Sequence, residues 1–214
     1  MSVDINMIRH NLTTETSPKW EQVLKLAREK GILRPRDLEP VGIAREYLNK
    51  LHSEGLLERV GRGLYRLPDA EVGRYSQLAE VAKRVPKAVV CLISALDYHE
   101  LTTQIPHQIW IAITLKDRIP RIDYPPLKVV RFSDAALSFG VDTHRIDGVE
   151  VKIFSPAKTV ADCFKFRSQV GFDVALEALR DSYRQNKATM NDLWEAAKVC
   201  RMTNVMRPYL ESLV

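Results

Sequence analysis

Three polar side chains with the chemistry of nucleic-acid recognition share one face of a predicted helix. Hydrophobic spacing predicts this helix from Ile43 to Glu54. Its apolar positions lie together, on the side that would face a core: Ala44, Tyr47, Leu48 and Leu51. At about 100° per residue, the opposite face carries polar residues: Arg45, Glu46, Asn49, Lys50 and Ser53. Arginine can donate two hydrogen bonds to guanine, asparagine can pair with adenine, and lysine suits a phosphate, so this face could enter a major groove.

A basic tight turn follows the helix. Apolar residues alternate on both sides of Gly61-Arg62-Gly63, which predicts a β-hairpin with Arg62 at its tip. The glycines let the backbone adopt positive φ and approach phosphates closely. A helix, a short helix, a longer helix and a basic hairpin follow one another in the order of a winged helix-turn-helix. The candidate DNA-binding residues are Arg34, Arg36, Arg45, Asn49, Lys50, Arg59, Arg62 and Arg66. Each of these features alone is also compatible with an ordinary solvated surface, and their order is what favours nucleic-acid binding.

Composition and charge bound the class of protein. The 214 residues are 45% hydrophobic and 28% charged, which is typical of a globular chain. The net charge is +5, and residues 19–67 hold eleven basic and seven acidic residues, a net charge of +4. No apolar run approaches a membrane span and no signal-peptide pattern opens the chain, so we expect a cytoplasmic protein. The three widely spaced cysteines, Cys91, Cys163 and Cys200, favour buried thiols over disulfides or a zinc site.

The elements that must position these residues fall into an α/β (α+β) chain of two domains. We expect a flexible arm over 1–18, a winged helix-turn-helix over 19–70 and a mixed α/β domain over 71–214, with the boundary near Pro68-Asp69. Strands are predicted at 108–115, 127–132 and 149–154, the last after a turn at Asp147-Gly148. Ser155-Pro156 predicts a helix start, and further helices are predicted at 75–85, 173–184, 190–200 and 203–213.

The chain resembles the type IV abortive-infection antitoxins, the AbiEi family, from about residue 19 to its end. In the first domain the resemblance lies in residues 42–48 and 55–65. In the second it lies in motifs that follow the family's order: residues 93–96, 98–102, 104–106, 109–112 and 155–162. The resemblance implies a non-enzymatic protein that binds inverted repeats in its own promoter. It also implies that the second domain counters a nucleotidyltransferase-type toxin, with or without a stable complex.

A polar cluster in the second domain offers candidates for toxin antagonism. These are Lys158, Asp162, Lys165 and Arg167 on the helix that begins at Ser155, where Lys158, Lys165 and Arg167 would form a basic surface. Because Lys158 and Asp162 are four residues apart, an ordinary i,i+4 ion pair is the simpler interpretation of those two.

Two other functions remain open alternatives. Glu150-Val151-Lys152, with Asp134 or Asp142 upstream, superficially fits a metal-dependent nuclease, although such alternation is common on a solvent-facing strand. A ligand-sensing transcriptional regulator is the second alternative. The histidines show no metal-ligand spacing, His99-Glu100 is not expected to be a catalytic dyad, and Ser94 lacks a nucleophile elbow. No phosphate-binding loop is present either, so we expect no cofactor and no metal.

Overall fold

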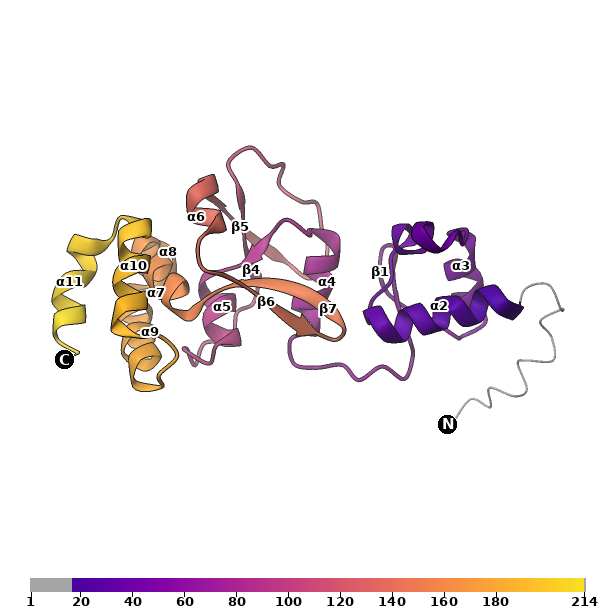
Figure 1. Cartoon of the computed structure of the whole chain (residues 1–214), viewed down its shortest axis with the longest axis horizontal. Coiled ribbons are helices and arrows are strands. Elements are labelled where there is room, and N and C mark those ends of the chain that lie inside the picture. Colours follow the sequence, from indigo (N-terminus) through magenta and orange to yellow (C-terminus); the bar gives the residue numbers. More distant parts are fainter. Residues whose placement is uncertain (1–16, 214) are drawn as a thin grey trace. The chain divides into compact units, whose positions relative to one another are not determined.

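The computed structural model describes residues 17–213, and the chain divides into two compact units of α+β class (Figure 1). The first unit comprises residues up to Ser76 together with Asp147–Val149, and the second comprises Gln77–Ile146 and the residues from Glu150 onward. The arm expected over 1–18 lies almost wholly outside the described residues.

The first unit begins with helix α2, Ser17–Lys30. Trp20, Val23, Leu24 and Ala27 are buried, as the three-and-four spacing of these residues requires of a helix packed on one side. The helix ends at Gly31, whose φ of 66° is a left-handed conformation that glycine adopts without steric cost. These side chains pack with Leu33, Leu38, Leu48 and Leu51 in the core of this unit.

Two short helices follow. The 3-10 helix η1 runs over Pro35–Val41, with a proline in its first turn, and ends at Gly42 with φ 64°. Helix α3 spans Glu46–Ser53, shorter than the expected 43–54. Its first turn is tightened, because the Tyr47 and Leu48 amides donate to carbonyls only three residues earlier, those of Ala44 and Arg45.

The expected burial of Ala44 is wrong. Ala44 is exposed and Ile43 is buried instead. Since α3 begins at Glu46, residues 43 and 44 lie outside the helical periodicity from which the burial of Ala44 was inferred. Leu48 and Leu51 are buried and Tyr47 is half-buried, so the remaining core face agrees with the prediction.

Strands β1 (Glu58–Gly61) and β2 (Leu64–Arg66) form the predicted antiparallel hairpin. Glu58 pairs with Arg66 and Arg59 with Tyr65, after which the register shifts before Gly61 meets Leu64. Of the two turn glycines, only Gly63 has positive φ, 68°, whereas Gly61 ends β1. Leu33 forms an antiparallel bridge to Tyr65, so a short third segment continues the sheet on the other side of β2.

The second unit is built on a five-stranded sheet in the order β5-β4-β3-β7-β6 (Figure 1). The strands are β3 (Val89–Val90), β4 (Ile109–Thr114), β5 (Leu127–Phe132), β6 (Val141–Ile146) and β7 (Val149–Phe154). Strand β3 is antiparallel to β4 and parallel to β7, while β4 and β5 are parallel. Asp147 and Gly148 both have positive φ, 47° and 77°, which is the conformation of a type I′ hairpin turn. The turn predicted between the last two strands is therefore present.

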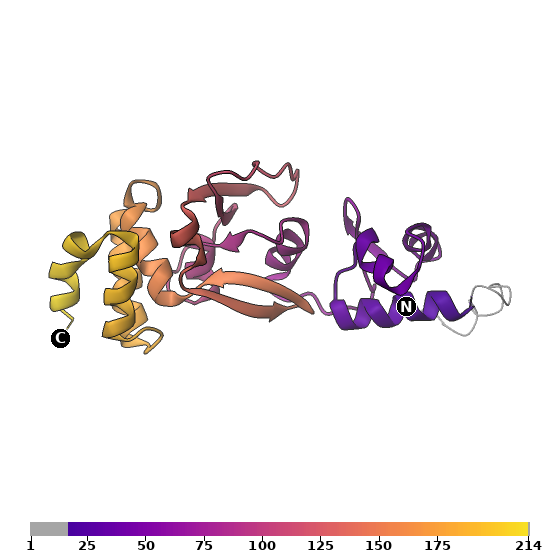
Figure 2. The same cartoon turned by 45° about the horizontal axis from the view of Figure 1, so that its top comes forward.

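Eight helices accompany this sheet among the described residues. They are α4 (Ser76–Arg84), α5 (Leu92–Tyr98), α6 (Asp134–Ser138), α7 (Pro156–Lys165), α8 (Arg167–Val170), α9 (Phe172–Arg184), α10 (Met190–Cys200) and α11 (Thr203–Glu211). Ser155 caps α7 by accepting a hydrogen bond from the Lys158 amide at 3.4 Å, with Pro156 in the first turn, as predicted. Helix α7 packs against α5, α9, α10 and α11, and α9, α10 and α11 gather with it at one end of the sheet (Figures 1 and 2). Its position is therefore central to the core of this unit.

Candidate nucleic-acid interface

The polar face predicted for α3 is exposed to solvent. Arg45, Asn49 and Lys50 are all exposed, as are Glu46 and Ser53. The Arg45 side chain is 79% exposed, and its Nε lies 3.3 Å from a carboxylate oxygen of Glu46, itself 71% exposed. An ion pair this open to water contributes little to stability and is easily exchanged for a ligand contact. The pKa of Glu46 is lowered by its own backbone N–H and by Arg45, so the face carries one negative charge among its cations at neutral pH.

One side chain of this face is held in place from the sheet. The Tyr65 hydroxyl donates a 2.7 Å hydrogen bond to Oδ1 of Asn49, although Asn49 itself is exposed. Tyr65 is only 4% exposed, and its ring meets the His52 ring edge-on at a centroid distance of 6.1 Å. Tyr65 is absent from the residues predicted to act at the site, because its alternating position indicates only a core residue. The signal that was available is chemical, since a buried tyrosine hydroxyl usually finds a hydrogen-bond partner.

Of the three arginines of the hairpin, one is exposed at the turn and two donate hydrogen bonds within the hairpin. Arg62 is exposed at the turn, next to Gly63. Arg59 is exposed but folds back, with Nε donating to the Gly61 carbonyl at 3.3 Å. Arg66 is only 19% exposed and donates two hydrogen bonds to Glu58, its cross-strand partner, at 3.1 and 3.5 Å. The Arg66 guanidinium is therefore engaged in an ion pair within the hairpin, and Arg62 is the hairpin cation best placed to contact a ligand.

The two arginines near η1 also differ. Arg36 is exposed, whereas the Arg34 side chain is 18% exposed and lies 3.9 Å from the Asp37 carboxylate. Asp37 in turn accepts a 2.8 Å hydrogen bond from the Arg34 amide, which fixes the start of η1. Burial and the neighbouring Arg36 charge lower the pKa of Arg34, and Asp37 opposes this shift. Of the eight predicted DNA-binding residues, six are exposed and two, Arg34 and Arg66, are partly buried beside an acid.

In the second unit, the predicted basic surface is wrong for Lys158. Lys158 and Asp162 are both fully buried and form a close ion pair, as the i,i+4 interpretation predicted. Lys158 Nζ lies 4.8 Å and 4.2 Å from the ring centroids of Phe132 and Phe154. Cys200 Sγ donates to the remaining Asp162 oxygen at 3.2 Å. Burial raises the pKa of Asp162, and the Lys158 charge opposes the shift.

Lys158 and Asp162 are buried because of the position of α7 in the second unit. Every residue from Ala157 to Phe164 is buried, because helices surround α7 and leave it no solvent-facing side over these turns. The two other candidates, Lys165 and Arg167, are exposed where this helix ends. Arg167 donates a 2.9 Å hydrogen bond to the Phe164 carbonyl.

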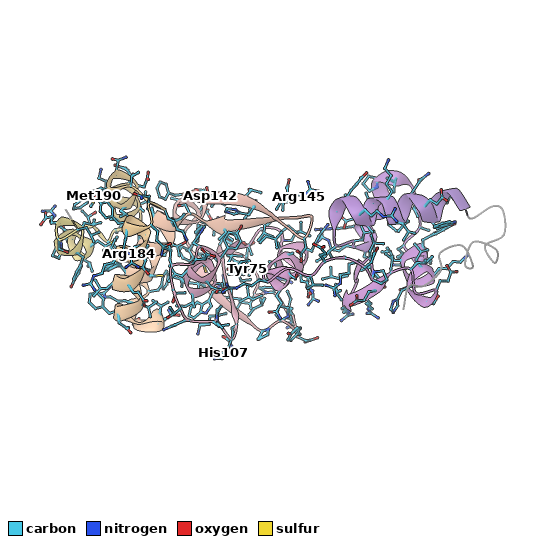
Figure 3. All side chains as sticks on the ribbon, turned by 90° about the horizontal axis from the view of Figure 1, so that it is seen from below. Tyr75, His107, Asp142, Arg145, Arg184 and Met190 are labelled. Atoms are coloured by element: carbon cyan, nitrogen blue, oxygen red, sulfur yellow. The ribbon has the colours of Figure 1, made fainter. Side chains whose placement is uncertain are left out.

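The residues named for a nuclease lie at the surface, with Asp142 on β6, the strand next to β7, and Asp134 at the start of α6. Glu150 and Lys152 are exposed on β7, and Asp142 and His107 project from different sides of the second unit (Figure 3). Over residues 17–213, no group of three or more His, Cys, Asp or Glu side chains gathers to hold a metal ion. His99 Nε2 lies 2.7 Å from the Phe154 carbonyl oxygen, while Glu100 is exposed near Lys187, so the two do not form a dyad.

The three cysteines are buried free thiols, as predicted. Burial raises the pKa of Cys200 to about 12 and those of Cys91 and Cys163 well above their usual value. Thiols protonated in this way are poor nucleophiles and poor metal ligands. Among the helices of the described part of the chain, none combines the length and the apolar character needed to cross a membrane.

Comparisons with known proteins agree with this arrangement. One solved structure, a crystal structure of the RV2827C protein from Mycobacterium tuberculosis, matches with a TM-score of 0.56 and 16% sequence identity. The match covers 92% of this chain and 80% of that one, and at this identity it shows a shared fold alone. A comparison with curated proteins found no match. Residues 21–68 match the model of a family described as a transcriptional regulator, AbiEi antitoxin. This segment contains the exposed face of α3 and the basic hairpin, and the match agrees with the resemblance to the AbiEi antitoxins over this part of the chain.

Proposed function

We propose that this chain is an antitoxin that binds inverted repeats in its own promoter and represses its operon. The observation that carries the proposal is the exposed face of α3, where Arg45, Asn49 and Lys50 stand free of the core within a segment that matches a regulator family. Helix, short helix, helix and hairpin follow one another here as in a winged helix, with α3 in the place of the recognition helix.

The positions of these residues favour base contacts for some of them and phosphate contacts for others. Recognition helices contact base edges chiefly through their N-terminal residues, and Arg45 stands at the N-terminal end of α3. Arg45 can donate two hydrogen bonds to guanine, and Asn49, one turn later, can pair with adenine. Lys50 and the hairpin residue Arg62 suit the phosphate backbone, where contacts position the protein and do not read sequence.

By the same proposal, the second unit counters a nucleotidyltransferase-type toxin. The sequence resemblance of residues 93–162 to the family's antitoxin domain supports this part. The unit has its own hydrophobic core, so it can carry a separate activity. Lys165 and Arg167 are the exposed candidates for contact with such a toxin. We assign Lys158 and Asp162 to the support of α7, because neither side chain reaches the surface.

One cellular experiment tests both parts. Cells carry a reporter of the chain's own promoter and, under separate control, a nucleotidyltransferase-type toxin gene tested as the partner. We expect the full chain to repress the reporter and to restore growth when the toxin is made. The double variant Arg45→Ala/Arg62→Glu should lose repression and keep the rescue, whereas Lys165→Ala/Arg167→Ala should do the opposite.

Arg28→Ala is the matched control, because Arg28 is exposed on α2, outside the predicted interface, and should retain both activities. Unchanged repression by the Arg45→Ala/Arg62→Glu variant would refute the assignment of α3 and the hairpin. Loss of rescue in the same variant would show that neutralisation works through DNA and that the division between the units is wrong.

A further inference from the structure

The hydrogen bond between Tyr65 and Asn49 joins the small sheet to the middle of α3. Tyr65 lies in the central segment of a three-segment ladder, opposite Arg59 on one side and Leu33 on the other. Its amide donates to the Leu33 carbonyl at 3.0 Å, and its carbonyl accepts from the Leu33 amide at 2.7 Å. With its backbone paired and its ring buried, Tyr65 has little freedom to move.

The ring lies along α3 and ends at an exposed side chain. It packs against His52, whose Nδ1 lies 3.0 Å from the Leu57 carbonyl oxygen, and its hydroxyl reaches Asn49, one helical turn earlier. A hydrogen bond to an exposed asparagine contributes little to folding, because water would satisfy the same amide. Its main consequence is therefore local, since it restricts the rotamers of a side chain that would otherwise be free.

Because Asn49 is the acceptor in this hydrogen bond, its amide can still donate and accept hydrogen bonds to a base. Oδ1 accepts from the tyrosine with one lone pair and keeps the second, while both Nδ2 hydrogens remain available. Adenine presents an acceptor, N7, beside a donor, N6, and an asparagine amide must lie in their plane to meet both. An amide already fixed in one plane binds without the loss of rotamer freedom that a mobile one incurs.

We infer that Tyr65 is a positioning residue for DNA sequence recognition, which holds the Asn49 amide in the orientation that reads a base pair. The inference rests on the proposed binding of α3 to operator DNA and adds a specificity-determining contact outside the exposed face. Tyr65 itself touches no base. It acts through Asn49, so its effect is confined to the base pair that Asn49 reads.

The experiment measures how well full-length variants discriminate between duplexes. Fluorescence anisotropy gives the affinity for the promoter duplex, for each single base-pair change within it and for a shuffled duplex. Asn49→Ala first identifies the base pair at which discrimination depends on Asn49. Tyr65→Phe then removes only the hydroxyl, and Tyr47→Phe is the matched control on α3, because Tyr47 is half-buried and its hydroxyl bonds to no other described residue. Thermal unfolding of each variant confirms that the fold is retained.

We expect Tyr65→Phe to lower discrimination at that base pair about three- to tenfold, the cost of ordering one free side chain. Affinity for the shuffled duplex and the salt dependence should not change, and Tyr47→Phe should resemble the wild type. In the Asn49→Ala background, Tyr65→Phe should have no further effect on discrimination.

Any of three results with Tyr65→Phe would overturn the inference. Discrimination could be unchanged in Tyr65→Phe, it could fall equally at every base pair, or the loss could persist in the Asn49→Ala background, which would reveal a purely structural role. If Asn49→Ala discriminates like the wild type at every position, the inference also fails, while DNA binding by α3 stands. A wild-type chain that binds promoter and shuffled duplexes equally would instead refute the proposed function.

Discussion

The two units place the same residue types in opposite environments. At α3, the N-cap residue Arg45 and the helix residue Lys50 are exposed near Glu46, and water screens their charges. On α7, Lys158 and Asp162 are fully buried and neutralise each other. The difference follows from packing, since α3 lies at the surface of a small domain whereas α5, α8, α9, α10 and α11 all pack against α7. The charges at α3 are available to a ligand, whereas those on α7 interact with each other inside the core.

The largest expected effect is the loss of the buried pair. Lys158→Ala leaves the Asp162 carboxylate without its partner in an apolar core and should lower the free energy of unfolding by about 3–5 kcal/mol. Urea denaturation followed by circular dichroism measures this change. Lys165→Ala, exposed on the same helix, is the control and should change stability by less than about 0.5 kcal/mol. Equal effects at the two positions would contradict the contrast between buried and exposed charge.

Charge reversal at the hairpin tests whether the exposed charges of the first unit contact DNA. Arg62→Glu should weaken binding to promoter and shuffled duplexes alike and lower the slope of log affinity against log salt by about 1 or more. Arg28→Glu, an exposed cation on α2, should do much less. Binding titrations at several salt concentrations give both slopes. Similar losses at both positions would mean a diffuse electrostatic effect and no contact at the hairpin.

A half-buried titratable group of the second unit, His99, should make its stability depend on pH. Burial lowers the pKa of His99, and the charges of His144 and Lys187 lower it further. The contact with the Phe154 carbonyl and the Asp142 charge oppose this shift. The folded state therefore keeps His99 neutral, while the unfolded chain takes up a proton below about pH 6.5. Stability should be complete above that pH and should fall as the pH drops, by at most about 1.4 kcal/mol per pH unit.

His99→Gln keeps a donor for the Phe154 carbonyl and cannot be protonated, so its stability should vary less between pH 6.5 and 5. Urea titrations at each pH measure the slopes. A variant with the same slope as the wild type would show that other groups cause the dependence.

The smallest expected effect concerns Arg66, a charged residue of the first unit that is committed to the fold. Because it pairs across the hairpin with Glu58, Arg66→Ala should cost about 0.2–1 kcal/mol of stability and hardly change DNA affinity. Denaturation and binding titrations on the same sample measure both. A DNA defect as large as that of Arg62→Glu would place Arg66 at the interface after all.

Local signals in the sequence predict most elements and the exposed, basic character of the candidate interface. The strand at Leu127–Phe132 and the helix at Met190–Cys200 have the predicted bounds, because apolar periodicity and caps such as Thr189 act within a few residues. The turn at Asp147-Gly148 follows from a dipeptide that tolerates positive φ. The exposed face of α3 likewise follows from helical spacing.

Long-range contacts account for what the sequence could not predict. The bridge from Leu33 to Tyr65 and the bond from Tyr65 to Asn49 join residues far apart in the chain, with no periodic pattern to mark them. Lys158 has the spacing of a surface ion pair, and only the helices packed around α7 decide that it is buried. Ala44 is exposed, contrary to the prediction, because α3 begins three residues later than the predicted start at Ile43.

The central claim, that α3 reads DNA sequence, is tested most directly by one titration series. Full-length wild type and Arg45→Ala are titrated with the promoter duplex and with a shuffled duplex of the same composition. The account predicts that the wild type prefers the promoter, and that Arg45→Ala loses about 1–3 kcal/mol of binding free energy on the promoter alone. An equal loss on both duplexes, or no loss on either, would contradict it.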